Sequence, residues 1–193
     1  DHAICIKTPY SDIMNLYVND IEPHTLNNIL FSIALSYEAG ARSPNVIKGL
    51  YDYNDIDGRF SIKEGQHGSR IIDSSYNANP QSFIASINSL VKLDCEPWLV
   101  MGEMGELGKN SELYHKQVAR YAYNMGVKKL FVISEHASAI LDEFGQNSYA
   151  FDSIEALIIF IKPQLHDNVN ILVKASRFMK FEIIVNGLTE RKN

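Results

Sequence analysis

From Gly58 onward, short apolar runs alternate with longer stretches whose apolar residues recur every three or four positions. The short runs predict strands over residues 70–73, 98–101, 130–133, 149–151 and 171–173. The longer stretches predict helices over residues 80–91, 111–125, 140–144, 153–161 and about 178–188. Strands that alternate with amphipathic helices favour a mostly parallel sheet covered on both faces. The expected fold class is therefore α/β and Rossmann-like.

The part before Gly58 has a different pattern. A short extended region is followed by one apolar-periodic stretch that ends near Gly40 and by a second that begins at Ser43-Pro44. Ser followed by Pro is typical of a helix N-cap with Pro in the first turn. The polar run of residues 55–58 (DIDG) then predicts a turn. We place a domain boundary there, with residues 1–56 in one domain and 57–193 in the other.

Composition excludes several classes of protein. The formal net charge is -5 and no dense Lys/Arg cluster occurs, which argues against a nucleic-acid partner. The two cysteines, Cys5 and Cys95, form no CxxC or Cys/His spacing, so neither a disulfide framework nor a zinc site is predicted. No apolar run approaches the roughly 20 residues of a membrane span. We expect a cytoplasmic monomer, and the missing initial Met predicts a piece of a longer protein.

Polar residues gather where three predicted strands end, and parallel sheets bind ligands at that edge. The first junction, residues 73–80 (DSSYNANP), precedes a helix and could hold a ribose, a phosphate or a peptide group. Local propensity offers an equally simple explanation, in which Asn79 is the N-cap and Pro80 opens the helix. Both explanations stay open.

Two other junctions have the same ambiguity. Residues 102–108 (GEMGELG) carry three glycines that let the backbone approach a ligand, but they match no phosphate-binding motif and could be a flexible loop before Ser111. Residues 174–177 (KASR) place two cations and a hydroxyl before the predicted last helix. This is either a carboxylate or phosphate site or a solvated basic turn. His24 and Asn28, four residues apart on one helix, form a smaller group.

Together these segments resemble the Mur ligase family. The resemblance rests on residues 75–80 (SYNANP), 102–108 (GEMGELG) and 172–177 (LVKASR), on the Gly58-Arg59 pair, and on His115 in the next helix. These motifs occur in the family's order and cover nearly the whole chain. The closest resemblance is to the member that joins D-alanyl-D-alanine to a UDP-N-acetylmuramoyl-tripeptide.

The resemblance implies a three-domain, ATP-dependent enzyme of which this chain holds the tail of the central ATP-binding domain and the C-terminal domain. The tripeptide carboxylate is activated as an acyl phosphate, which the dipeptide amine attacks, and Mg²⁺ neutralises the phosphates. ATP and Mg²⁺ would be bound mainly by segments absent from this sequence, so the chain alone is expected to be inactive. No catalytic residue is assigned. The implied nucleotide contacts are Asn28, Arg59, Asp73 and Ser74, and the implied substrate contacts are Tyr76, Asn77, Asn79, Lys174, Ser176 and Arg177.

Three positions depart from the family pattern: Thr25 replaces an amide, Ser74 replaces a carboxylate and Ala175 replaces a glycine. Two further hypotheses therefore remain. One is a sister ligase, either another Mur ligase or a folylpolyglutamate synthase-like enzyme. The other is a nucleotide-binding module without catalysis. A phosphate-binding loop in the upstream sequence would exclude the module.

Overall fold

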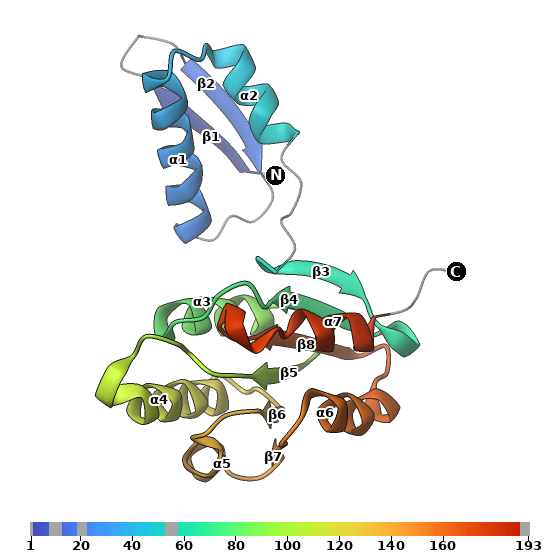
Figure 1. The fold of residues 1–193 in the computed structure, drawn as a ribbon. Coiled ribbons are helices and arrows are strands. Elements are labelled where there is room, and N and C mark those ends of the chain that lie inside the picture. Colours follow the sequence, from blue (N-terminus) through green and yellow to red (C-terminus); the bar gives the residue numbers. More distant parts are fainter. Residues whose placement is uncertain (1, 8–12, 19–22, 53–57, 190–193) are drawn as a thin grey trace. The chain divides into compact units, whose positions relative to one another are not determined.

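A computed structural model of the chain describes residues 2–7, 13–18, 23–52 and 58–189 (Figure 1). The chain divides into two compact units, residues 1–54 and 55–193. Of the turn predicted over residues 55–58, only Gly58 lies within the described residues, so the division into domains 1–56 and 57–193 stays a prediction. Among the described helices, none is both long and apolar enough to cross a bilayer.

The first unit is a hairpin followed by two helices. Its elements are β1 (His2–Lys7), β2 (Ile13–Val18), α1 (Pro23–Glu38) and α2 (Ser43–Tyr51), and β1 pairs with β2 antiparallel. Ile33 and Val46 are its buried apolar side chains among the described residues, and Tyr37 packs against them. The sequence predicted both helices but only an extended region where the hairpin lies. The predicted cap was wrong, because Arg42 is the N-cap of α2 and Ser43 already lies in the helix.

The second unit is built on a six-stranded sheet with the order β3-β4-β8-β5-β6-β7. All neighbouring strands pair parallel except β3 with β4. The strands are β3 (Ser61–Glu64), β4 (Arg70–Ser74), β5 (Glu96–Met101), β6 (Lys129–Val132), β7 (Ser148–Ala150) and β8 (Val169–Lys174). The helices are α3 (Pro80–Val91), α4 (Ser111–Asn124), α5 (Ala137–Phe144), α6 (Ile154–Ile161) and α7 (Glu182–Leu188). The predicted α/β fold is confirmed.

Successive strand residues supply two separate cores, because side chains alternate across a sheet. In β8, Leu172 packs with α3, α4 and α5, whereas Ile171 and Val173 pack with α6 and α7. The neighbouring strand β5 divides in the same way, with Leu99 on one side and Val100 on the other. Both faces are covered, which explains why the strands are almost continuously apolar.

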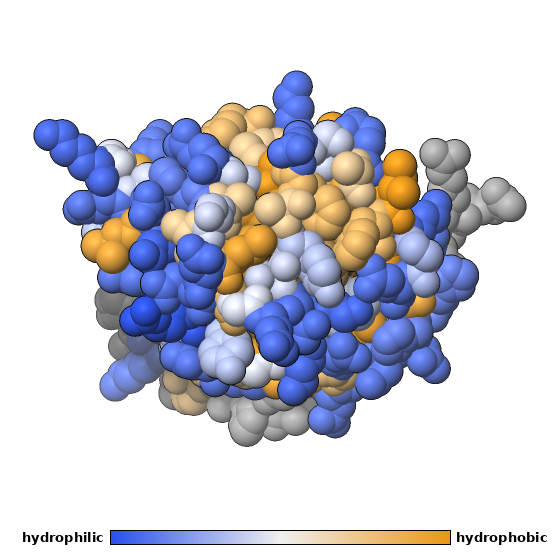
Figure 2. All heavy atoms as spheres, turned by 90° about the horizontal axis from the view of Figure 1, so that it is seen from below, coloured by the Kyte–Doolittle hydropathy of each residue, from blue (hydrophilic) through white to orange (hydrophobic). Residues whose placement is uncertain are grey.

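The helix α6 carries apolar side chains on its exposed face as well as on its buried face. Leu157 and Ile161 lie in the core, but Ile159 is 73% exposed and Phe160 is 37% exposed. Figure 2 views the second unit from the side of α5, α6 and β7 and shows apolar side chains gathered among charged ones. The sheet edge at β7 therefore presents apolar side chains to solvent.

The strand order places a topological switch next to β8. The chain leaves β4 and β5 toward α3 and α4 on one face, but it leaves β8 toward α7 on the other face. Parallel sheets bind ligands where the segments after neighbouring strands part in opposite directions, which here is at the carboxyl ends of β4, β8 and β5. The three polar junctions of the sequence lie at this edge.

We expect residues 55–193 to fold without residues 1–54, because both cores described above lie inside this unit. The isolated unit should give a mixed α/β circular dichroism spectrum and a single cooperative thermal transition. Residues 1–54 alone should show no such transition, because so short a segment buries too little apolar surface. Gradual, non-cooperative melting of residues 55–193 would contradict this expectation.

Candidate functional site

The three polar junctions lie side by side. In the sheet, Lys174 at the end of β8 is in register with Ser74 at the end of β4 and with Met101 at the end of β5. The backbone N–H of Gly102 donates to the carbonyl oxygen of Lys174 at 3.0 Å. A side chain on Gly102 would collide with Ala175 and Phe181, since an added Cβ would lie 2.7 and 2.6 Å from them. The close approach of these segments thus requires glycine there.

The first junction is shaped by Asp73. This buried carboxylate accepts hydrogen bonds from the backbone N–H and hydroxyl of Ser75, at 3.1 and 2.7 Å. Its other oxygen lies 3.3 Å from the ammonium of Lys63. Asn79 caps α3 in a capping box with Ser82, so the local explanation for Asn79 and Pro80 is confirmed. Asp73 and Asn79 therefore stabilise this turn through hydrogen bonds, whether or not they also contact a ligand.

Two side chains of the same turn, Tyr76 and Asn77, are exposed. The guanidinium of Arg59 lies 4.7 Å from the centroid of the Tyr76 ring, and that of Arg177 lies 6.0 Å from it. Gly58 makes the first approach possible: its carbonyl accepts from the backbone N–H of Tyr76, and its φ of +81° is one that glycine adopts freely. Arg177 also pairs with Glu182 at 3.3 Å. Two guanidiniums beside one ring form a cationic surface suited to an anion.

The position of Lys174 corrects the sequence interpretation. The predicted last helix does not start near residue 178: a 3-10 turn occupies Arg177–Met179, and α7 begins at Glu182. Residues 174–177 therefore do not lie at the N-terminus of an α-helix. Lys174 is 3% exposed, and its ammonium donates to the hydroxyl of Ser74 and the carbonyl of Asn77, both at 3.0 Å. Burial lowers the pKa of Lys174 to about 8.

Ser176 connects all three junctions. Its hydroxyl accepts from the backbone N–H of Gly105 at 2.8 Å and donates to the carbonyl of Ala78 at 3.4 Å. Its own N–H donates to the carbonyl of Glu103 at 2.8 Å. Ser176 is buried, so these bonds are shielded from water and hold the three segments in one arrangement.

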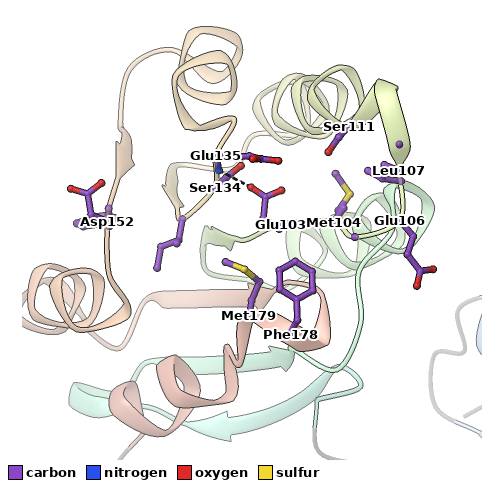
Figure 3. Close-up of a pocket in the computed structure, with 14 residues that line it drawn as sticks. Glu103, Met104, Glu106, Leu107, Ser111, Ser134, Glu135, Asp152, Phe178 and Met179 are labelled. Carbon is purple, nitrogen blue, oxygen red and sulfur yellow. Dashed lines mark hydrogen bonds between the residues drawn. The ribbon is translucent and has the colours of Figure 1, made fainter.

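A cavity of about 690 Å³ lies beside this connection (Figure 3). Glu103 lies between Phe178 and Met179, which follow β8, and Ser134 and Glu135, which follow β6. The ionisable side chains that line it, among the described residues, are the carboxylates of Glu103, Glu106, Glu135 and Asp152. The cavity is therefore acidic, in contrast to the neighbouring surface of Arg59 and Arg177.

Glu103 stays ionised in the cavity wall. Partial burial raises its pKa, but His115 in its protonated form, the hydroxyl of Ser134 and the backbone N–H of Glu135 hydrogen-bond to the carboxylate and lower the pKa to about 2. The bond from Glu135 N to Glu103 Oε1 is 2.7 Å long. His115 is fully buried and receives a bond from the backbone N–H of Met104 at 3.0 Å. The loop of residues 102–108 is thus anchored from α4 and from the segment after β6.

The remaining predicted residue, Asn28, lies in the first unit. Its side chain is exposed on α1, and its backbone carbonyl accepts from the hydroxyl of Ser32 at 2.8 Å. The side chain of His24 lies outside the described part of the structure. The adenine contact proposed for Asn28 stays a prediction.

Sequence reasoning missed the segment after β6. Ser134, Glu135 and His136 follow the end of β6 after Ile133, and the strand-end rule applied to the first three junctions could have found them. It also missed Phe178, which is 64% exposed at the cavity.

Lys174 should make stability depend on pH in a defined window. Between pH 8 and 10.5 an unfolded chain keeps the lysine proton that the folded protein has released, so the free energy of unfolding should rise with pH there. Urea unfolding across this range should show the rise in the natural protein and not in Lys174→Met. The control is Lys162→Met at an exposed lysine, which should keep the rise. Equal slopes for the natural protein and Lys174→Met would disprove the buried-lysine interpretation.

Comparison with known proteins adds independent information. Residues 58–177 match the model of the family "Mur ligase, glutamate ligase domain". The UDP-N-acetylmuramoyl-tripeptide–D-alanyl-D-alanine ligase of Escherichia coli is 31% identical over 169 residues, which are 86% of this chain and 37% of that protein. The chain therefore spans a little over a third of the length of this relative.

Solved structures agree in fold. A MurF structure from Acinetobacter baumannii superposes with a TM-score of 0.82 at 25% identity, over 98% of this chain and 42% of that one. MurF from Thermotoga maritima in complex with ADP gives a TM-score of 0.75 at 23% identity, over 96% of this chain and 42% of that one. These matches extend over both compact units.

Proposed function

We propose, from the premise that this chain belongs to the Mur ligase family, that it is part of a peptidoglycan-precursor ligase that adds D-alanyl-D-alanine to a UDP-N-acetylmuramoyl-tripeptide. The observation that carries the proposal is the hydroxyl of Ser176, whose bonds to Gly105 and Ala78 bring the three family motifs to one sheet edge. The name of the Escherichia coli relative supports the choice of substrates. A sister ligase remains the alternative, and the Ser75–Pro80 stretch (SYNANP) favours the first choice.

The proposed reaction has two steps. An oxygen of the tripeptide carboxylate attacks the terminal phosphorus of ATP, ADP leaves and an acyl phosphate forms. The dipeptide amine nitrogen then attacks the acyl carbon, loses a proton and displaces inorganic phosphate. Both steps place negative charge on transferring oxygens, which cationic side chains stabilise.

The residues of this chain would bind and orient the reactants. We assign Arg59 and the turn of Asp73 and Ser74 to the nucleotide side, and Tyr76 and Asn77 to the reacting groups. Arg177, an exposed cation, would receive the dipeptide carboxylate. Lys174, in contrast, would act from inside, because its ammonium holds the turn through Ser74 and Asn77.

The family also implies Mg²⁺, but the strand ends offer few free oxygen ligands for this ion. Mg²⁺ prefers several oxygen ligands and usually phosphates, but the buried carboxylate of Asp73 is already engaged by Ser75 and Lys63. We therefore assign the ion, with most of the ATP contacts, to segments outside these 193 residues. Asn28 would add an adenine contact from the first unit.

Arg177→Ala in the full-length enzyme should raise the KM for D-alanyl-D-alanine about tenfold and leave the KM for ATP nearly unchanged. The reason is the loss of a charge-assisted hydrogen bond to the dipeptide carboxylate, worth about 1.5–3 kcal/mol before solvent screening. Phosphate release at varied dipeptide and varied ATP measures both constants. Arg120→Ala is the matched control, since Arg120 is exposed and pairs with Glu143 on α4 and α5. A rise confined to the KM for ATP would place Arg177 on the nucleotide side.

This chain alone should bind ATP weakly. Backbone N–H groups of a GxxxxGK[ST] loop supply most phosphate contacts in such sites, and this sequence has no such loop. Isothermal titration of the 193-residue chain with ATP and Mg²⁺ should give no saturable heat at micromolar concentrations. A micromolar Kd would show that these residues hold the phosphates themselves.

A further inference from the structure

Three side chains of metal-ligand type meet beside the acidic cavity. Glu103 follows β5, His115 lies on α4, and His136 is the N-cap of α5. One ligand atom from each lies within 4.8 Å of the others. The side chains come from three different segments, so their meeting is a product of the fold and not of local sequence.

The hydrogen bonds of His115 prepare it to be a ligand. Its Nδ1 lies 2.8 Å from the carbonyl oxygen of Ser111, which can only accept, so Nδ1 carries a proton. In the neutral ring Nε2 then presents a lone pair, as in metal-binding histidines whose other nitrogen donates to a carbonyl. In the structure that lone pair accepts from the backbone N–H of Met104 at 3.0 Å, and Glu103 Oε2 lies 3.2 Å from the same nitrogen. A cation bound to both atoms would bring them together in place of the Met104 bond.

His136 supplies a third ligand that solvent can reach. Its side chain is 17% exposed, and its Nε2 lies 3.1 Å from the hydroxyl of Ser111, a residue of the cavity wall. The ring centroids of His136 and His115 are 5.1 Å apart. An ion could therefore enter from the cavity.

The distances are near those of a tetrahedral site. Zinc bonds of about 2.0–2.1 Å put neighbouring ligand atoms about 3.3 Å apart, and the Glu103–His115 contact of 3.2 Å already fits. The partly exposed ring of His136 would have to approach by at most about 1.5 Å from the 4.8 Å limit. Binding would also give up the bond that Met104 N donates to His115.

We propose that Glu103, His115 and His136 bind a divalent transition-metal ion that ties the loop of residues 102–108 to α4 and α5. Two imidazoles and one carboxylate suit Zn²⁺ and its neighbours, whereas Mg²⁺ prefers oxygen ligands. The sequence argument against zinc concerned cysteine spacing, and this ligand set contains no cysteine. The site is independent of the proposed ligase reaction.

The test uses the full chain without a histidine tag, stripped of metal and titrated with Zn²⁺ and separately with Mg²⁺. We expect one Zn²⁺ per chain with a micromolar or lower Kd, a rise in Tm with Zn²⁺, and neither with Mg²⁺. Co²⁺ in place of Zn²⁺ should give the visible absorption of a tetrahedral site.

The variants His136→Ala and Glu103→Gln should each weaken Zn²⁺ binding at least tenfold and keep the circular dichroism spectrum. We avoid His115, since it is fully buried and its loss could unfold the protein. The matched control is His166→Ala, because His166 also lies beside a glutamate, Glu96, at 3.9 Å. Absence of stoichiometric Zn²⁺ binding would overturn the proposal and leave a proton between Glu103 and His115. Zn²⁺ binding that survives both variants, or Mg²⁺ binding of equal strength, would also overturn it.

Discussion

The second unit depends on the pairing of β8 along both of its edges. All six residues of this strand are buried, and its side chains divide between the two cores. Without β8, no hydrogen bonds would join β4 to β5, and the sheet would divide into two parts. The same strand ends in Lys174 and leads to Ser176, so the strand that completes the sheet also closes the candidate site.

The surfaces on the two sides of Ser176 carry opposite charge. Arg59 and Arg177 lie near the Tyr76 ring, whereas the cavity beyond Gly105 is lined by carboxylates. A ligand that carries charge is therefore favoured on one side and repelled on the other. Lys174 adds little to this field, because its ammonium is buried and bonded within the protein.

Much of this fold could be predicted from the sequence, because periodicity and local capping decide it. Asn79 and Pro80 start α3 as their types predict, and the strand-end rule brought together the correct three junctions. The strand β3 was missed since Ile62, its apolar residue, is half exposed at the sheet edge. The start of α7 was placed too early, because Lys180 adopts a φ of 55° that ends the preceding turn. Strand order and the burial of Lys174 depend on contacts between distant residues, which local patterns do not contain.

The position of β8 also has a consequence for how the chain is made. A ribosome delivers residues in order, and β4 and β5 emerge about 70 residues or more before Val169. Until β8 arrives, the nascent chain has two unpaired inner strand edges, and the face that α7 covers is only partly covered; both features promote association between chains. This unit must therefore finish its sheet late in translation, and the intermediate that waits for β8 is the form in which chaperones would be of most use to it.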